Sequence, residues 1–204
     1  MSYTEEAWIK RYANRSDITV MLTHLTKPND KLDKLEVLIK ILNEKKIIGS
    51  TTKTGFIIGK KPAVCFQEAP LYSVAQNCYY EIQKSKADKS YTAKYSAVGL
   101  QFTKFYIFNK GGRPVFYEKS DIAKQILPPD EHWRIVDLDI SDKNQFTDWT
   151  HEREWRLPGD LNFEYEHTYI VLPSKPIFNR IYDELDPQII KSIAGITVLN
   201  QVFA

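Results

Sequence analysis

The sequence has 204 residues, with 28 Lys and Arg against 26 Asp and Glu, so its net charge at pH 7 is +2. Hydrophobic residues make up 43% of the chain and aromatic residues 13%, which excludes a chain that is disordered throughout. Eight Gly and two Cys exclude collagen-like and disulfide-rich classes, and the balanced charge excludes a strongly basic nucleic-acid-binding protein.

The first third of the chain is predicted to hold a helix, a strand and a second helix. Residues 5–13 form the short first helix, and 17–26 are β-branched and apolar, which is typical of a strand. Leucine and isoleucine then recur at three- and four-residue spacing over 32–42, the clearest helical pattern in the chain. Asn29 or Asp30 is the expected N-cap of that helix.

The middle third is predicted to contain a hairpin after two short strands and a helix. The expected elements are two short strands, a helix, a long strand and its hairpin partner, at 55–59, 62–66, 70–85, 95–108 and 113–117. Gly111 and Gly112 predict the turn of the hairpin.

The last third alternates between the two kinds of element without a regular order. The predictions are a helix at 119–127, strands at 133–140, 152–157 and 167–172, one or two short helices within 176–192 and a strand at 195–203. Loop signals are scattered evenly and no segment repeats, which predicts a single domain over residues 1–204. We therefore expect the α+β class, with a mixed, mainly antiparallel sheet and flanking helices.

Several classes of site lack their motif in the sequence. There is no P-loop, no dinucleotide-binding glycine motif, no HExxH and no GxSxG, and the histidines are not spaced as metal ligands, so no metal is predicted. Cys65 and Cys78 are predicted to be reduced, buried thiols. The first residues do not resemble a signal peptide and no apolar run approaches a membrane span, which predicts a cytoplasmic protein.

The segment 149–156 is the strongest candidate for chemistry. If it is a strand, Glu152, Glu154 and Arg156 share one face. Two carboxylates two residues apart repel each other unless a cation lies over them, and either Arg156 or a ligand fits that need. A solvated strand face with an ion pair is the simpler interpretation, and the sequence leaves both open.

Two earlier segments add polar groups that suit a ligand. His24 and Thr26 share a face at the end of a predicted strand, where both can bond to the hydroxyls of a ribose. Gln67 and Glu68 lie at the start of the helix predicted at 70–85, where they line a pocket or complement the helix dipole. Satisfied polar groups of the fold remain the alternative in both segments.

Basic residues cluster around the predicted hairpin. They are suited to phosphates, and tyrosines near them are suited to stacking on bases; the four are Lys94, Lys104, Lys110 and Arg113. A purely structural hairpin is the alternative interpretation.

Taken in this order, the segments resemble the AbiGi-like group of bacterial abortive-infection proteins. The resemblance covers residues 20–160. Its motifs are His-x-Thr, Cys-Phe-x-Glu-x-Pro-Leu, Tyr-x-x-x-Gly, Arg-Pro-Val-x-Tyr and Trp-x-x-Glu-x-Glu-Trp-Arg, at His24–Thr26, Cys65–Leu71, Tyr95–Gly99, Arg113–Tyr117 and Trp149–Arg156. The Glu-x-Glu-Trp-Arg piece is the most specific of them.

The same layout is similar to the ADP-ribosyltransferase fold, including the DarT-type enzymes that modify DNA. That resemblance implies NAD as the cofactor, a carboxylate that holds the nicotinamide ribose and an aromatic ring stacked on nicotinamide. It implies that His24 and Thr26 contact ribose and that Tyr95 or Tyr80 supplies the stacking ring. It also implies further cofactor contacts from Glu68 and Arg156, and catalysis by Glu152 or Glu154. Arg156 is not part of the usual pattern, and it either holds a phosphate or neutralises a glutamate.

The resemblance implies a phage-defence protein that transfers ADP-ribose, with nucleic acid as the candidate acceptor. Two alternatives stay open. One is a non-enzymatic antitoxin or phage-sensing module that binds a protein partner of a toxin–antitoxin or phage-defence system. The other is a metal-dependent nuclease in which Glu152 and Glu154 hold Mg²⁺, although Arg156 would repel that ion.

Overall fold

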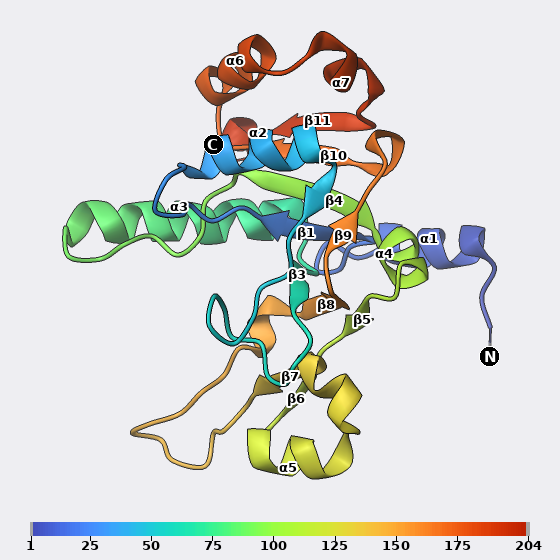
Figure 1. Cartoon of the computed structure of the whole chain (residues 1–204), viewed down its shortest axis with the longest axis vertical. Helices are drawn as coiled ribbons and strands as arrows, with labels where there is room; N and C mark the ends of the chain where they lie inside the picture. The colour runs from blue at the N-terminus through green and yellow to red at the C-terminus, as the bar shows by residue number, and fades with distance from the viewer. Residues whose placement is uncertain (1, 203–204) are drawn as a thin grey trace. The chain divides into compact units, whose positions relative to one another are not determined.

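The computed structural model describes residues 2–202, which form two compact units built from alternating stretches of the chain (Figure 1). Unit 1 consists of the chain up to Lys45, residues Ala69–Thr103 and the chain from Phe163 onward; unit 2 consists of Lys46–Glu68 and Lys104–Asn162. Helices and mainly antiparallel strands occur in both, which confirms the α+β class. That the chain is one domain stays a prediction.

The strands of unit 1 form a sheet around β4. Strand β4 (Gly99–Thr103) pairs antiparallel with β1 (Met21–Leu25) on one side and with β10 (Tyr169–Leu172) on the other, and β10 pairs parallel with β11 (Gly195–Val198). A Cβ at Gly99 would collide with the carbonyl oxygen of His24, so this close pairing of β1 and β4 requires a glycine.

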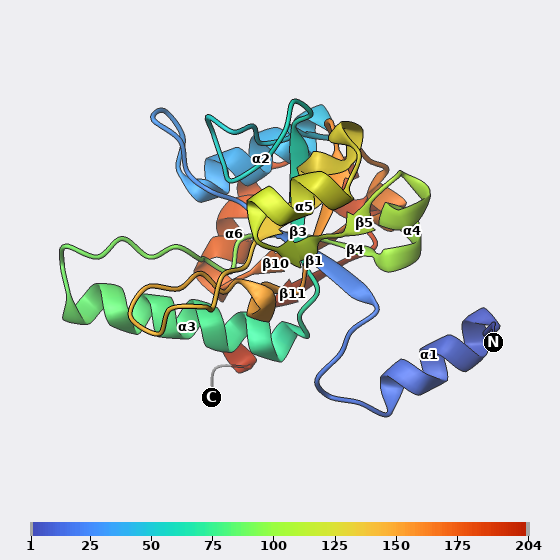
Figure 2. The ribbon, with the colours of Figure 1, turned by 90° about the horizontal axis from the view of Figure 1, so that it is seen from below.

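The helices of unit 1 differ in burial: the first and the last of them contain no fully buried residue, and the three between them do. They are α1 (Glu5–Ala13), α2 (Lys34–Glu44), α3 (Leu71–Ala87), α6 (Lys175–Glu184) and α7 (Pro187–Ser192), with 3-10 turns η3 (Tyr165–His167) and η4 (Leu199–Gln201). Helix α3 contributes Val74 and Cys78 to a buried cluster with Val171 and Leu199. After α3 the chain turns back along the helix (Figure 2). In this segment the Tyr91 hydroxyl donates to buried Glu81.

The N-cap of α2 differs from the prediction. The Asp33 carboxylate accepts the N–H groups of Leu35 and Glu36, and the Glu36 carboxylate accepts the N–H of Asp33, which completes a capping box. The prediction of Asn29 or Asp30 as the cap was therefore wrong, because the helix begins after Asp33.

Unit 2 is organised around β8. Strand β8 (Glu154–Pro158) pairs antiparallel with β3 (Ala63–Gln67) on one side and β5 (Arg113–Pro114) on the other. Two small pairs accompany it: β2 (Lys46–Ile47) with β9 (Leu161–Asn162), and β6 (Phe116–Glu118) with β7 (Ile135–Asp137). The helical segments are α4 (Lys104–Asn109), α5 (Ser120–Ile126), η1 (Pro129–Arg134) and η2 (Thr150–Glu152).

The predicted hairpin over 95–108 and 113–117 is not formed. The strand ends at Thr103 and α4 follows, because Lys104 and Ile107 are buried at helical spacing. Gly111, with φ at +102°, ends that helix, and β5 pairs with β8. The apolar residues of this stretch fit either period, and burial within unit 2 selects the helix.

Several other predicted strands are absent or shorter than expected: those at 17–26 and 195–203 are reduced to β1 and β11, for example. Residues 55–59 form turns in which Phe56 is exposed and Gly59 has a positive φ. The strand predicted at 133–140 is reduced to β7, since a 3-10 helix extends to Arg134. Both cysteines are free thiols as predicted, but only Cys78 is fully buried, and Cys65 is half-buried.

No helix within residues 2–202 combines the length and the apolar character needed to cross a membrane.

Candidate functional site

A tight left-handed turn separates Glu152 from Glu154. Glu152 ends the 3-10 turn η2, Arg153 has a φ of +44°, and Glu154 begins β8. A left-handed backbone at a residue other than glycine costs about 1 kcal/mol or more and is frequent at functional sites. The strand predicted from residue 152 therefore starts two residues later, and simple alternation does not place Glu152.

A hydrogen bond from Gln67 holds the Glu152 carboxylate on the same face of the sheet as Glu154. Gln67 lies opposite Glu154 in the β3–β8 register, so the two side chains point to the same side. The Gln67 amide donates to Glu152 Oε2 at 2.6 Å, and His151 Nε2 lies 3.4 Å from Glu152 Oε1. The Glu152 side chain is 12% exposed. The two glutamates thus share a face, but it is the hydrogen bond from Gln67, and not alternation along a strand, that places Glu152 there.

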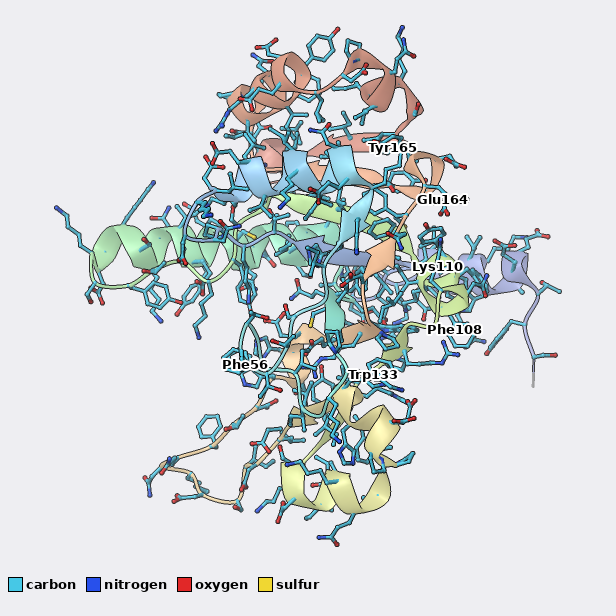
Figure 3. All side chains as sticks on the ribbon, viewed as in Figure 1. Phe56, Phe108, Lys110, Trp133, Glu164 and Tyr165 are labelled. Carbon is cyan, nitrogen blue, oxygen red and sulfur yellow. The ribbon has the colours of Figure 1, made fainter. Side chains whose placement is uncertain are left out.

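Arg156 neutralises Glu154. Its Nε donates to Glu154 Oε1 at 2.8 Å and its Nη2 to Oε2 at 3.3 Å, a two-pronged contact. The Arg156 side chain is 3% exposed and that of Glu154 17%. Arg156 Nη1 also donates to the carbonyls of Trp133 and Ile135 at 2.8 and 3.0 Å (Trp133 is labelled in Figure 3). Of the two roles expected for Arg156, the structure supports neutralising a glutamate over holding a phosphate.

Tyr117 is the residue that the sequence pattern did not single out. Its hydroxyl oxygen accepts the N–H of Glu154 at 2.8 Å. Burial, with a further contribution from the carboxylates of Glu154 and Glu152, raises the pKa of Tyr117 to about 12. The phenol is therefore neutral at physiological pH, and it lies within the field of both glutamates. The only sequence signal was its place at the end of the Arg113–Tyr117 motif.

Glu68 lies in a second polar cluster on the opposite face of β8. Lys104 Nζ is 2.6 Å from Glu68 Oε1, and the Trp155 indole N–H donates to Glu68 Oε2 at 2.8 Å. Trp155 alternates with Glu154 and Arg156 along the strand, so it points to the other side. Both oxygens of Glu68 are engaged within unit 2, and Lys104, expected near phosphates, is its partner.

The remaining predicted contacts belong to unit 1. His24 is half-buried in β1. Thr26 is buried, and its hydroxyl lies 2.9 Å from the Lys34 carbonyl and 3.0 Å from the Val98 carbonyl, so it serves the fold of that unit. Tyr95 packs partly buried against the α3 cluster, whereas Tyr80 is exposed. The structure therefore brings together the predicted residues Glu152, Glu154 and Arg156 within unit 2.

Within residues 2–202, no group of three or more His, Cys, Asp or Glu side chains is arranged to hold a metal ion.

Comparison with known proteins adds no relative. No protein-family model matches the chain, and no curated protein or solved structure is significantly similar to it. The resemblance to abortive-infection proteins and ADP-ribosyltransferases therefore remains an expectation from the motifs.

Proposed function

We propose that this chain is an NAD-dependent, ADP-ribosyltransferase-like enzyme of phage defence that acts in the cytoplasm. The observation that carries the proposal is the pair of carboxylates on one face of unit 2, Glu152 and Glu154, each fixed by its own donor. Fixed carboxylates stabilise positive charge without reorganising during a reaction. The motif order in the sequence supplies the class of reaction.

The polar groups of this face suit the nicotinamide riboside part of NAD. Glu152, Glu154 and Arg156 together carry one negative charge, which complements a cationic nicotinamide ring. NAD supplies a glycosidic bond whose cleavage builds positive charge on the ribose, as in glycoside hydrolysis. Carboxylate acceptors beside the neutral Tyr117 phenol match the hydroxyls of a sugar.

The two glutamates have different roles in this proposal. Arg156 takes both oxygens of Glu154, so that carboxylate orients its surroundings and has little charge left to offer the substrate. Glu152 accepts from the neutral Gln67 amide at Oε2, which orients the carboxylate, and His151 Nε2 lies 3.4 Å from Oε1. We therefore assign electrostatic stabilisation of the ribose to Glu152 and a positioning role to Glu154.

Nucleic acid is the acceptor that we propose to test first. The support is the motif resemblance and the exposed surface of α3, where three tyrosines and two lysines face solvent: Tyr72, Tyr79, Tyr80, Lys84 and Lys86. Tyrosine rings stack on bases without regard to sequence, and lysines pair with phosphates.

Thermal unfolding with and without millimolar NAD tests the proposal, followed by an assay of NAD cleavage. NAD at 100 times its Kd stabilises the folded state by about 2.7 kcal/mol. Glu152→Gln is expected to retain binding and lose about 100-fold or more in kcat, in the range seen when one stabilising group is removed. Glu166→Gln, at an exposed position of unit 1, is the matched control and should keep full activity.

The absence of both stabilisation and cleavage in the wild-type protein would refute the enzyme. Capture of a protein partner would then favour the antitoxin or phage-sensing alternative. Cleavage of RNA or DNA that a chelator abolishes would favour the nuclease.

A further inference from the structure

The hydroxyl of Tyr117 has a free donor. Its oxygen accepts the N–H of Glu154 at 2.8 Å, and within residues 2–202 its own hydrogen has no acceptor. An oxygen that receives an amide on one side directs its hydrogen away from that amide. The residue as a whole is half-buried.

The surroundings of the hydroxyl are strongly polarised. Burial and the nearby carboxylates of Glu154 and Glu152 raise the pKa of Tyr117 to about 12, so it donates at neutral pH and does not act as a base. Glu152 and Glu154 accept hydrogen bonds in their ionised form. A fixed neutral donor thus lies in the field of two fixed acceptors.

This combination selects one ligand chemistry. A sugar hydroxyl both donates and accepts, so its oxygen can receive the phenol hydrogen while its own hydrogen goes to a carboxylate. A phosphate would be repelled by the glutamates. A bare cation would meet the Tyr117 hydrogen, and Arg156 already occupies both oxygens of Glu154.

We propose that Tyr117 is a substrate-contacting residue that donates a hydrogen bond to a ribose hydroxyl, whose own hydrogen is accepted by Glu152. The identity of that ribose as the nicotinamide ribose rests on the proposed function. The hydroxyl contact itself requires only a riboside.

A purely structural role predicts a different result, and the chain offers a matched control for it. In unit 1, the hydroxyl of buried Tyr165 donates to the Leu42 carbonyl at 2.7 Å. Tyr165→Phe and Tyr117→Phe each remove one phenol oxygen that is bonded to the backbone. Both are expected to lower stability, but only Tyr117→Phe should alter ligand recognition.

Titration calorimetry with nicotinamide riboside and its 2′-deoxy and 3′-deoxy forms tests the contact. The wild-type protein should bind the riboside more tightly than the deoxy form that lacks the contacted hydroxyl, by about 5- to 10-fold for each hydrogen bond lost. Tyr117→Phe should weaken riboside binding by the share of one bond and leave binding of that deoxy form unchanged, so that its discrimination is smaller than that of the wild type. Tyr165→Phe should discriminate as the wild type does.

The outcomes separate this inference from the proposed enzyme. Discrimination in Tyr117→Phe as large as in the wild type, or a wild-type protein that binds the riboside and both deoxy forms alike, overturns the contact. The second comparison needs no variant, so it holds even if Tyr117→Phe unfolds. Tyr117-dependent discrimination without NAD cleavage refutes the enzyme and keeps the contact. If NAD is cleaved, and Tyr117→Phe has an unchanged KM and unchanged discrimination, the enzyme is kept and the contact is refuted.

Discussion

Replacing Arg156 by methionine should destabilise the protein more than any exposed charge substitution. Arg156→Met leaves the Glu154 carboxylate, 17% exposed, without its guanidinium partner. It also removes the donor to the carbonyls of Trp133 and Ile135. Breaking a buried ion pair on one side costs about 3–5 kcal/mol, because the remaining charge is left uncompensated.

That cost is a large part of the stability of a chain this size. Folded domains are stable by about 5–15 kcal/mol, and in a 150–250-residue protein each kcal/mol lowers Tm by about 2–4 °C. Arg156→Met should therefore lower Tm by about 6–20 °C. Urea unfolding followed by tryptophan fluorescence gives the free energy directly.

An exposed ion pair on α6 provides the comparison. Arg180 is 39% exposed and lies 2.6 Å from Glu184, with Asp33 and Glu36 at 3.2 and 3.8 Å, and exposed ion pairs contribute about 0–1 kcal/mol each. If Arg156→Met and Arg180→Met cost the same within 1 kcal/mol, the reasoning about burial is wrong. The double variant Glu154→Gln/Arg156→Met should cost less than the two single substitutions added together, because it removes both charges.

Two further predictions concern pH. The pKa of Asp33 is lowered, chiefly because its carboxylate accepts the Glu36 N–H. Its stabilising effect is therefore fully present above the unfolded-state pKa of 3.8 and is lost as pH falls toward the folded-state pKa. Asp33→Ala should cost about 1 kcal/mol at pH 7 and flatten the acid limb of the stability curve; an unchanged acid limb would contradict the cap. Tyr117 has a raised pKa of about 12, so its contribution is complete below pH 10 and is lost as pH rises from 10 to 12. Phenolate absorbance should show one tyrosine fewer among the late-titrating groups in Tyr117→Phe, and an unchanged titration would refute its burial beside the glutamates.

Local patterns were sufficient for elements with one strong period. The leucines of α2 recur at helical spacing, and the strand at 63–67 was predicted within one residue at each end. The stretch 104–109 failed because its apolar residues satisfy both periods, and burial of Lys104 and Ile107 decides between them. Such a choice is made by residues far away in the sequence.

The candidate site was predictable in its residue types and less so in its geometry. The pairing of Arg156 with Glu154 follows from alternation along a strand, and the structure has it. The left-handed backbone at Arg153 leaves no signature in the residue types, so the sequence did not indicate how the Glu152 side chain comes to lie on this face. Tyr117 reaches Glu154 from 37 residues away, a contact that periodicity cannot indicate.

The interleaved order of the two units has a consequence for synthesis on the ribosome. Gln67 and Glu152 are 85 residues apart, and β3 has its partner β8 only after Pro158 has been made. Strand pairings of this separation form slowly, and until then the nascent chain exposes an unpaired strand edge to chaperones. A product released before residue 152 lacks both glutamates, so premature termination yields a polypeptide without the site rather than a partly active one.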